Sequence, residues 1–345
     1  MSLLGKLEES HVNDMLARMS GAERSNCVQQ AAYGVDVSAV AIDHENYLLQ
    51  CSDPLSYLPQ IGLRESAWLS MVLIANDMAT TGVAPQFAQL VMNLPADMQE
   101  SEYQEFWSNI HEYAKKLGIA ITGGHTSFIP GYNSTLAGGG TLSSIAKKDL
   151  VRFSHMAKPG DLLLMSGCAG KSSSSILAKS FPEKIKAEVG KEVQQKVAEM
   201  FFQTSVVEVG VLAAQFGGVH AMHDVTEGGV VGASFEMAKA AQLGLDLQLD
   251  EINVDPEIQQ VMDVFDLDSR YCIGAGAMLI ACAEDQFADL KISFDERGIP
   301  LSKIGKFKEH TSIVSHKNGK QLELKNPGAD PYWMTYFNAV EKGWK

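Results

Sequence analysis

The sequence is short of cysteine and of long apolar runs. Its 345 residues include only five cysteines, an odd number without any Cys-x-x-Cys pair, so we predict neither a disulfide framework nor a zinc knuckle. No apolar run approaches the roughly 18 residues of a membrane span, and the first residues lack the charged-then-apolar order of a signal peptide. These absences predict a cytoplasmic protein that does not bind membranes.

Positive charge is also scarce. Lysine and arginine number 28 against 42 acidic residues, which gives a formal net charge of −14. No basic face is available to neutralise a phosphate backbone, so nucleic acid is not expected as a partner. The length allows two domains, and the 46% hydrophobic share excludes a disordered or fibrous chain.

The hydrophobic pattern predicts an α/β (α+β) protein in which strands alternate with helices. An irregular stretch around the Pro159-Gly160 turn predicts a domain boundary, with domains at 1–155 and 156–345. The elements expected in the first domain are a weak helix at 4–20, a hairpin of strands at 38–42 and 47–51, a helix at 65–78, a strand after Pro85, a helix at 101–117, a strand at 119–122 and a strand ending near Ala146.

The second domain has the same character. Its serine run, 172–175, is expected to form a flexible, substrate-facing loop. The elements expected here are strands at 161–167, 220–223, 245–249 and 277–282, and helices at 175–180, 184–202, 204–216, 229–241, 256–265 and 285–297.

Four aspartates stand beside turn residues at the ends of expected strands or helices. They are Asp36, Asp53, Asp77 and Asp224. If folding gathers them, their mutual repulsion needs a divalent cation to offset it, and an all-oxygen ligand set suits magnesium. A magnesium site in turn implies a phosphate substrate. Each aspartate taken alone could instead cap a helix or a turn.

Two glycine turns follow apolar strands. Gly123-Gly124-His125-Thr126 is one, and the stretch from Asp224 to Gly229 is the other. Backbone N–H groups at such strand ends can hold phosphate oxygens. His125 and His223 are placed for acid–base or phosphate contacts. Thr226 could equally be an ordinary N-cap, with the glycines easing a tight turn.

A third turn, Gly170-Lys171-Ser172, resembles part of a P-loop. That motif needs a glycine five positions before Gly170, where Met165 stands. A P-loop kinase using Lys171 is therefore a weak alternative. GxSxG, HExxH and GxGxxG patterns are absent, which removes the common hydrolase, metalloprotease and dinucleotide-binding signals.

In order along the chain, these motifs resemble the series of one superfamily. The matching segments are 34–40, 51–53, 76–85, 123–126 and 224–229. The series is similar to that of AIR synthase and its relatives, which include HypE, thiamine-monophosphate kinase, selenophosphate synthetase and formylglycinamidine ribonucleotide synthetase. The resemblance runs from about residue 30 to 330, and the Asp-x-Thr-x-Gly-Gly form at Asp224 is most like the HypE branch.

The resemblance implies a homodimer in which the strands of two N-terminal domains share a barrel, a C-terminal α/β domain, and a cleft that binds ATP with Mg²⁺. It implies that Asp224 and His125 are candidate catalytic residues and that Asp36, Asp53 and Asp77 bind the metal. The residues that it assigns to cofactor binding are Asp36, Asp53, Asn76, Asp77, Gly123, Gly124, Thr126, Thr226, Gly228 and Gly229.

The implied activity is ATP-driven phosphorylation of an acyl, amide or phosphate oxygen on a small-molecule or protein-borne substrate. Positioning and electrostatic stabilisation would supply most of the catalysis. HypE carries its carbamoyl group on a C-terminal cysteine, and no cysteine follows Cys282 here, so the acceptor is left open. The alternatives are AIR synthase activity, thiamine-monophosphate kinase activity, or a non-catalytic nucleotide-binding maturation or regulatory protein, which the departures at Val35 and His125 from the family pattern would fit.

Overall fold

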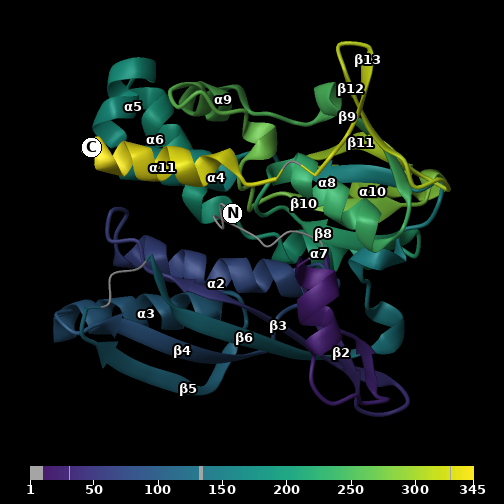
Figure 1. Ribbon diagram of the computed structural model, residues 1–345, viewed down its shortest axis with the longest axis horizontal. Coiled ribbons are helices and arrows are strands. Elements are labelled where there is room, and N and C mark those ends of the chain that lie inside the picture. The colour runs from purple at the N-terminus through teal and green to yellow at the C-terminus, as the bar shows by residue number, and fades with distance from the viewer. Residues whose placement is uncertain (1–10, 31, 132–134, 327) are drawn as a thin grey trace.

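The computed structural model describes residues 11–30, 32–131, 135–326 and 328–345. Figure 1 shows two lobes, each built around one β-sheet, with helix α2 (Leu63–Ala79) between them. The weak helix expected at 4–20 lies partly outside the described residues. Within them, that segment forms two short helical turns, η1 (Val12–Leu16) and η2 (Ala17–Met19).

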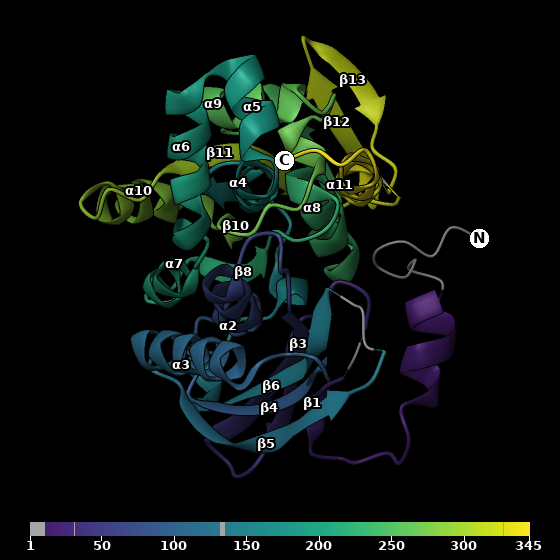
Figure 2. The same ribbon diagram turned by 90° about the vertical axis from the view of Figure 1, so that its left-hand side faces the viewer.

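The first lobe is a six-stranded sheet in the order β1-β2-β3-β6-β4-β5. All neighbours are antiparallel except β4 and β5, and the expected hairpin is present as β2 and β3. Figure 2 shows α2 and α3 on the same side of this sheet. The bounds are β1 Cys27–Gln29, β2 Ser38–Ala41, β3 Asn46–Ser56, β4 Phe87–Pro95, α3 Glu100–Lys116, β5 Ala120–Ile129 and β6 Leu136–Lys147.

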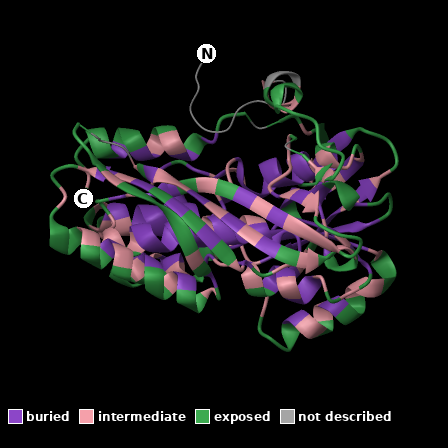
Figure 3. Ribbon diagram, turned by 90° about the horizontal axis from the view of Figure 1, so that it is seen from below, coloured by how far each residue is buried: buried purple, intermediate pink, exposed green. Residues whose placement is uncertain are grey.

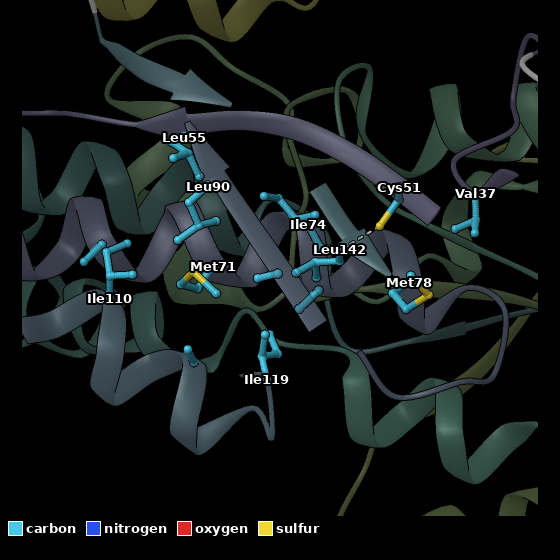
Figure 4. Close-up of a cluster of buried hydrophobic side chains, with 14 of the residues drawn as sticks. Val37, Cys51, Leu55, Met71, Ile74, Met78, Leu90, Ile110, Ile119 and Leu142 are labelled. Atoms are coloured by element: carbon cyan, nitrogen blue, oxygen red, sulfur yellow. Dashed lines mark hydrogen bonds between the residues drawn. The ribbon is translucent and has the colours of Figure 1, made fainter. Parts of the chain in front are cut away.

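The core of this lobe lies between the sheet and α2. In β4 the buried residues alternate with more exposed ones, because successive side chains of a strand point to opposite faces. Figure 4 shows Met71 and Ile74 of α2 among Leu90 of β4 and Leu142 of β6, all of them buried. Each such side chain contributes about 1.5–3 kcal/mol by leaving water.

The other face of this sheet is less covered. Figure 3, seen from below, shows exposed residues along its strands. Phe87 and Val91 of β4 are 41% and 44% exposed. Ile145 of β6 is 47% exposed.

The second lobe is a seven-stranded sheet in the order β13-β12-β9-β11-β7-β10-β8, in which only β9 and β12 are parallel neighbours. Two interior strands, β7 and β10, are buried along their whole length. The bounds are β7 Leu162–Ser166, β8 Val219–Asp224, β9 Gly244–Gln248, β10 Met278–Cys282, β11 Leu301–Lys308, β12 Ile313–Lys317 and β13 Lys320–Glu323.

Helices flank this second sheet (Figure 1). They are α4 Lys171–Ser180, α5 Pro182–Val189, α6 Lys191–Glu199, α7 Val207–Ala213, α8 Gly229–Ala240, α9 Pro256–Asp263, α10 Phe287–Asp295 and α11 Pro331–Glu341. Short turns are η3 Lys148–Leu150, η4 Ser154–Met156, η5 Met200–Gln203, η6 Leu249–Glu251, η7 Ser269–Tyr271 and η8 Glu284–Gln286. In the part of the chain that is described, no helix is both long and apolar enough to cross a bilayer.

The prediction of a flexible loop at the serine run is wrong. Residues 172–175 are not a flexible loop but buried positions in the first half of α4. Ser173 and Ser175 satisfy their hydroxyls by donating to the carbonyls of Gly170 and Ser172, both at 3.1 Å. Such local bonds let serine occupy a buried helix face, which a composition argument cannot detect.

Other elements also differ from expectation. The helix predicted at 184–202 is divided at Gly190, whose φ of 91° breaks the helical path, and the one predicted at 204–216 is confined to α7. Strands β1, β11, β12 and β13 and helix α11 were not predicted from the hydrophobic pattern. The first sheet ends at Lys147 and the second begins at Leu162, so the predicted boundary after residue 155 falls between them.

Candidate functional site

A cavity of about 330 Å³ lies between the two lobes. Among its lining residues are three of the four aspartates that the sequence singles out, Asp36, Asp53 and Asp77. They come from the segment before β2, from β3 and from the last turn of α2. Folding thus brings together carboxylates that are separated by up to 41 positions in the sequence.

The position of Asp77 is electrostatically unfavourable in the chain by itself. It lies in the last turn of α2, where the helix dipole presents partial negative charge and the turn itself holds no basic residue. A carboxylate there is destabilising unless something positive binds beside it. This is the pattern expected of a residue kept for binding rather than for stability.

The buried thiol of Cys51 lies near enough to all four aspartates for their charges to affect its pKa. The pKa of this thiol, on β3, is raised well above its usual value, first by burial and then by the negative charges of Asp77, Asp36, Asp53 and Asp224. All four aspartates therefore act on one buried point. Because the donors are oxygens and none of the described residues that line the cavity is Lys, Arg or His, the set fits a hard divalent cation such as Mg²⁺.

The fourth aspartate, Asp224, lies just behind this cavity. It ends β8 and is only 2% exposed. Ligand atoms of Asp36, His223 and Asp224 lie within 4.8 Å of one another. Asp224 is therefore close to the predicted metal ligands, but it lies behind the residues that line the cavity.

His223 is the cationic partner of Asp36 and Glu236 behind the lining of the cavity. Its ring is 1% exposed, with Nδ1 2.8 Å from Asp36 Oδ2 and 3.1 Å from Ser154 Oγ, and Nε2 3.3 Å from Glu236 Oε2. Burial alone would lower the pKa of His223, but the charge of Asp36 and the hydrogen bonds with Asp36 and Glu236 raise it to about 10. The ring thus joins Asp36 of the first lobe to β8 and α8 of the second.

The second glycine turn contributes Thr226 and Glu227 to the cavity lining. The N–H of Gly228 donates to Asp330 Oδ2 at 2.8 Å, and that of Gly229 donates to the carbonyl of Thr226 at 3.2 Å. The two glycine donors that were predicted to hold phosphate therefore already have partners within the chain. Asp330 also caps α11 by accepting from Tyr332 N at 2.8 Å, so it ties α11 to this turn.

Replacing Asp330 with asparagine tests this link. Burial raises the pKa of Asp330 to about 6 from 3.8, against the lowering effect of the hydrogen bonds from Tyr332 and Gly228. The folded state therefore binds this proton more tightly than the unfolded state. The stability that Asp330 contributes is full below pH 3.8 and is lost as the pH rises through about 6.

Asparagine keeps the capping geometry but does not titrate. We expect the free energy of unfolding of the wild type, minus that of D330N, to fall between roughly pH 4 and 7 in urea titrations. A difference that stays constant or rises over this interval would contradict the raised pKa.

The segment predicted as the first glycine turn is not a turn but part of a continuous strand, and it does not reach the cavity. Gly123, Gly124, His125 and Thr126 lie on β5, the edge strand, where all four are exposed. Strands β6 and β4 separate β5 from β3, which carries Asp53, and this places the turn roughly 14 Å away across the sheet. Within one chain, His125 therefore has no access to the clustered aspartates.

Asn76 and Lys171 have structural contacts. The Asn76 carboxamide donates to Thr204 O and accepts from Val206 N, both at 2.9 Å, and the side chain is fully buried. It joins α2 to the second lobe instead of lining the cavity. The Lys171 ammonium donates to Gln203 O at 3.3 Å and Gly276 O at 3.5 Å and is also absent from the lining, which disfavours the P-loop alternative.

The sequence patterns did not predict that aromatic residues line the cavity. Tyr332, Trp333 and Tyr336 of α11 line it. The available signal was Asp330-Pro331, an N-cap followed by proline at the first helical position, which marks a helix start. Together with the aromatic residues that follow, this signal could have revealed α11.

Two family models match the chain. One, described as AIR synthase related protein, N-terminal domain, matches residues 34–143, and the other, described as AIR synthase related protein, C-terminal domain, matches residues 158–317. The carbamoyl dehydratase HypE of Escherichia coli is 24% identical over 333 residues, covering 94% of this chain and 91% of that protein.

Solved structures of similar proteins share the fold. AaThiL complexed with AMPPCP and TMP gives a TM-score of 0.72 at 14% identity, covering 94% of this chain and 98% of the other. The hydrogenase maturation protein HypE in complex with ATP gives 0.65 at 18% identity, covering 95% of this chain and 97% of the other. At these identities the likeness concerns the fold alone.

Proposed function

Since this chain belongs to the AIR synthase related protein family, we propose that it is an ATP- and Mg²⁺-dependent enzyme that phosphorylates an acyl, amide or phosphate oxygen of an acceptor. The observation that carries this proposal is the meeting of Asp36, Asp53 and Asp77 at one cavity between the lobes. The HypE structure in complex with ATP supports the choice of nucleotide.

In the proposed reaction, a bond forms between the γ-phosphorus of ATP and an oxygen of the acceptor. The bond from that phosphorus to the bridging oxygen breaks, and ADP leaves with the electron pair. An acyl, amide or phosphate oxygen attacks with a lone pair that it already has, so the protein's main task is to position both partners.

The lining residues suit this task. Asp36, Asp53 and Asp77 would hold magnesium, which when bound supplies positive charge at the transferring phosphoryl group. Thr226 adds a hydroxyl to the lining of the same cavity, whereas the Ser172 hydroxyl, which also lines it, donates to Ile273 O at 3.1 Å. Because the site lies between two packed lobes, it limits the access of water, which would otherwise compete with the acceptor.

A homodimer is part of this proposal. β5 is an edge strand with unpaired backbone groups on one side, and an uncovered sheet edge invites another chain. Phe87 and Val91 of β4 and Ile145 of β6 lie exposed on the uncovered face of the sheet, and exposed apolar groups of this kind mark association surfaces. A second copy on this surface could bring its own His125 turn to the cavity. Sedimentation equilibrium would give twice the chain mass if the proposal holds.

Changing Gly123 to alanine tests whether the turn serves a second copy. A Cβ at Gly123 would meet no atom within 4 Å in the chain, whereas at Gly124, with φ +144°, it would meet Leu90 O at 1.9 Å. We therefore expect G123A to leave the free energy of unfolding unchanged within about 0.5 kcal/mol. Its ATP affinity should fall at least tenfold if the turn contacts nucleotide across a dimer.

The matched variant G124A should lose stability because of the clash with β4. If G123A binds ATP as tightly as the wild type, the turn has no part in nucleotide binding. Calorimetric titration with ATP and Mg²⁺ and urea unfolding of both variants provide the two measurements.

Steady-state ADP release decides between catalysis and simple binding. We expect ATP binding by calorimetry together with ADP release that rises when an acceptor is added, and thiamine monophosphate is the first acceptor to try. Binding without ADP release under any acceptor condition would favour a non-catalytic nucleotide-binding protein. Absence of both ATP binding and ADP release would refute the proposed function.

A further inference from the structure

The cavity changes character along its length. Leu69, Leu73 and Asp77 line it from α2, and their spacing of four residues places them on one helix face over about 12 Å. The surface along this helix therefore passes from apolar at Leu69 to acidic at Asp77.

Other elements of the lining show the same order. Along β3 and the residues after it, Asp53 is followed by Ser56 and then by Leu58. On α4, Ser172 is followed one turn later by Ile176. At the end of the cavity near Asp77, these three elements contribute polar residues. At the opposite end, the same three elements contribute apolar residues.

Helix α11 closes the cavity with aromatic rings. Tyr332 and Tyr336 are 1% and 2% exposed and so form a fixed wall, whereas Trp333 is only half-buried. Flat rings of this kind hold apolar or planar groups well and also attract cations. Glu227, which lines the cavity as well, adds a fourth carboxylate to the lining.

The charge of the lining restricts what can bind. It contains four acidic residues and, among the described residues, no Lys, Arg or His. A negative group on the ligand could be offset only beside a metal at Asp36, Asp53 and Asp77. Anywhere else in the cavity, an anion would lose its water without gaining a positively charged partner.

We propose that the acceptor is an amphipathic molecule or side chain whose non-anionic, apolar or planar body lies along Leu69, Leu73 and α11, with its reacting oxygen facing Asp77. This inference rests on the proposed function and deepens it, because it names the class of acceptor. It excludes acceptors that carry a phosphate or carboxylate on the body, away from the reacting oxygen.

Phenylacetamide and phenylacetate test the charge preference. They share one ring and nearly the same shape but differ by one negative charge. In calorimetric or fluorescence titrations in EDTA without nucleotide, where no metal offsets the carboxylate, we expect phenylacetamide to bind saturably and phenylacetate to bind at least tenfold more weakly. Equal or tighter binding of phenylacetate, or no saturable binding of phenylacetamide, would overturn the inference.

Three variants locate the probe. W333A should weaken phenylacetamide binding at least threefold, whereas M334A, on the outer side of the same helix with Met334 60% exposed, should not. E227Q should narrow the preference for phenylacetamide over phenylacetate, and a cooperative melting transition of each variant shows that the probe is added to folded protein. Equal effects of W333A and M334A would show that the probe does not lie against α11.

ATP affinity is measured with Mg²⁺ on the same protein preparations, so the two proposals can fail separately. Binding of phenylacetamide without ATP binding would refute the proposed function and leave the apolar, non-anionic subsite established. ATP binding with a preference for phenylacetate would refute the inference about the acceptor alone.

Discussion

Replacement of Asp53 or Asp77 by asparagine is expected to reduce ATP-dependent ADP release at least 100-fold. Both carboxylates line the cavity between the lobes, and asparagine keeps their size while removing the charge that would hold a divalent cation. The loss of a metal that neutralises a transferring phosphoryl group removes several kcal/mol of transition-state stabilisation. Steady-state ADP release and calorimetric titration with ATP and Mg²⁺ measure the effect.

The same variants should not be less stable than the wild type without metal. Asp53 and Asp77 act with Asp36 and Asp224 on a single buried thiol, so removing one charge relieves repulsion in the metal-free protein. We expect the melting temperature in EDTA to stay the same or to rise by a few degrees. A fall in melting temperature together with lost activity would indicate misfolding instead.

Two control variants sharpen this prediction. D289N changes an exposed aspartate of α10 and should leave ADP release unaltered. K171A removes the lysine that a P-loop would require, and since Lys171 holds backbone carbonyls outside the cavity, we expect it to retain ATP binding. Loss of ATP binding in K171A with full binding in D53N would instead support the P-loop alternative.

Replacement of His223 by leucine is expected to lower the free energy of unfolding by about 3–5 kcal/mol. The histidine lies between Asp36 and Glu236 at 2.8 and 3.3 Å and is 1% exposed. Leucine fills much of the same space but leaves both carboxylates without their cationic partner in a poorly solvated place. Urea unfolding of the metal-free protein measures the change.

The effect of H223L should depend on pH in a defined direction. The folded-state pKa of His223 is raised to about 10 from 6.5, so the stability that it contributes is full below pH 6.5 and is lost as the pH rises through about 10. The difference between wild type and H223L should therefore shrink on the alkaline side.

A double-mutant cycle with E236L provides the control for H223L. Because His223 and Glu236 interact directly, the double variant should lose less stability than the sum of the single variants. Additive losses, or a cost of H223L below about 1 kcal/mol, would show that the imidazole does not hold these carboxylates together.

Helix α2 shows how far local pattern can predict this structure. The three- and four-residue spacing of its apolar side chains predicted a helix at 65–78, and the structure has Leu63–Ala79. The same pattern gave no role to Asn76, because its partners, Thr204 and Val206, are more than 120 positions away. Contacts at such a distance leave no trace in a local period.

The serine run shows that tertiary packing can overturn a prediction made from local composition. Composition favoured a flexible loop at 172–175, but tertiary packing buries these residues in α4. Propensity is a weak local term, and burial of the neighbouring Ile176 and Leu177 outweighs it.

The sequence by itself determined in what order the motifs occur, and hence the family, because this feature depends on neighbours in the chain. It placed Asp53 beyond the end of a strand at 47–51, whereas the structure has it inside β3. Only the tertiary structure decided that Asp36, Asp53 and Asp77 share one cavity while His125 lies apart on the edge strand. Tertiary packing also decided that the rings of α11 line this cavity and that His223 pairs with Asp36 behind its surface. Convergence of this kind depends on sheet order and on the docking of the two lobes, which contacts between residues far apart in the chain establish.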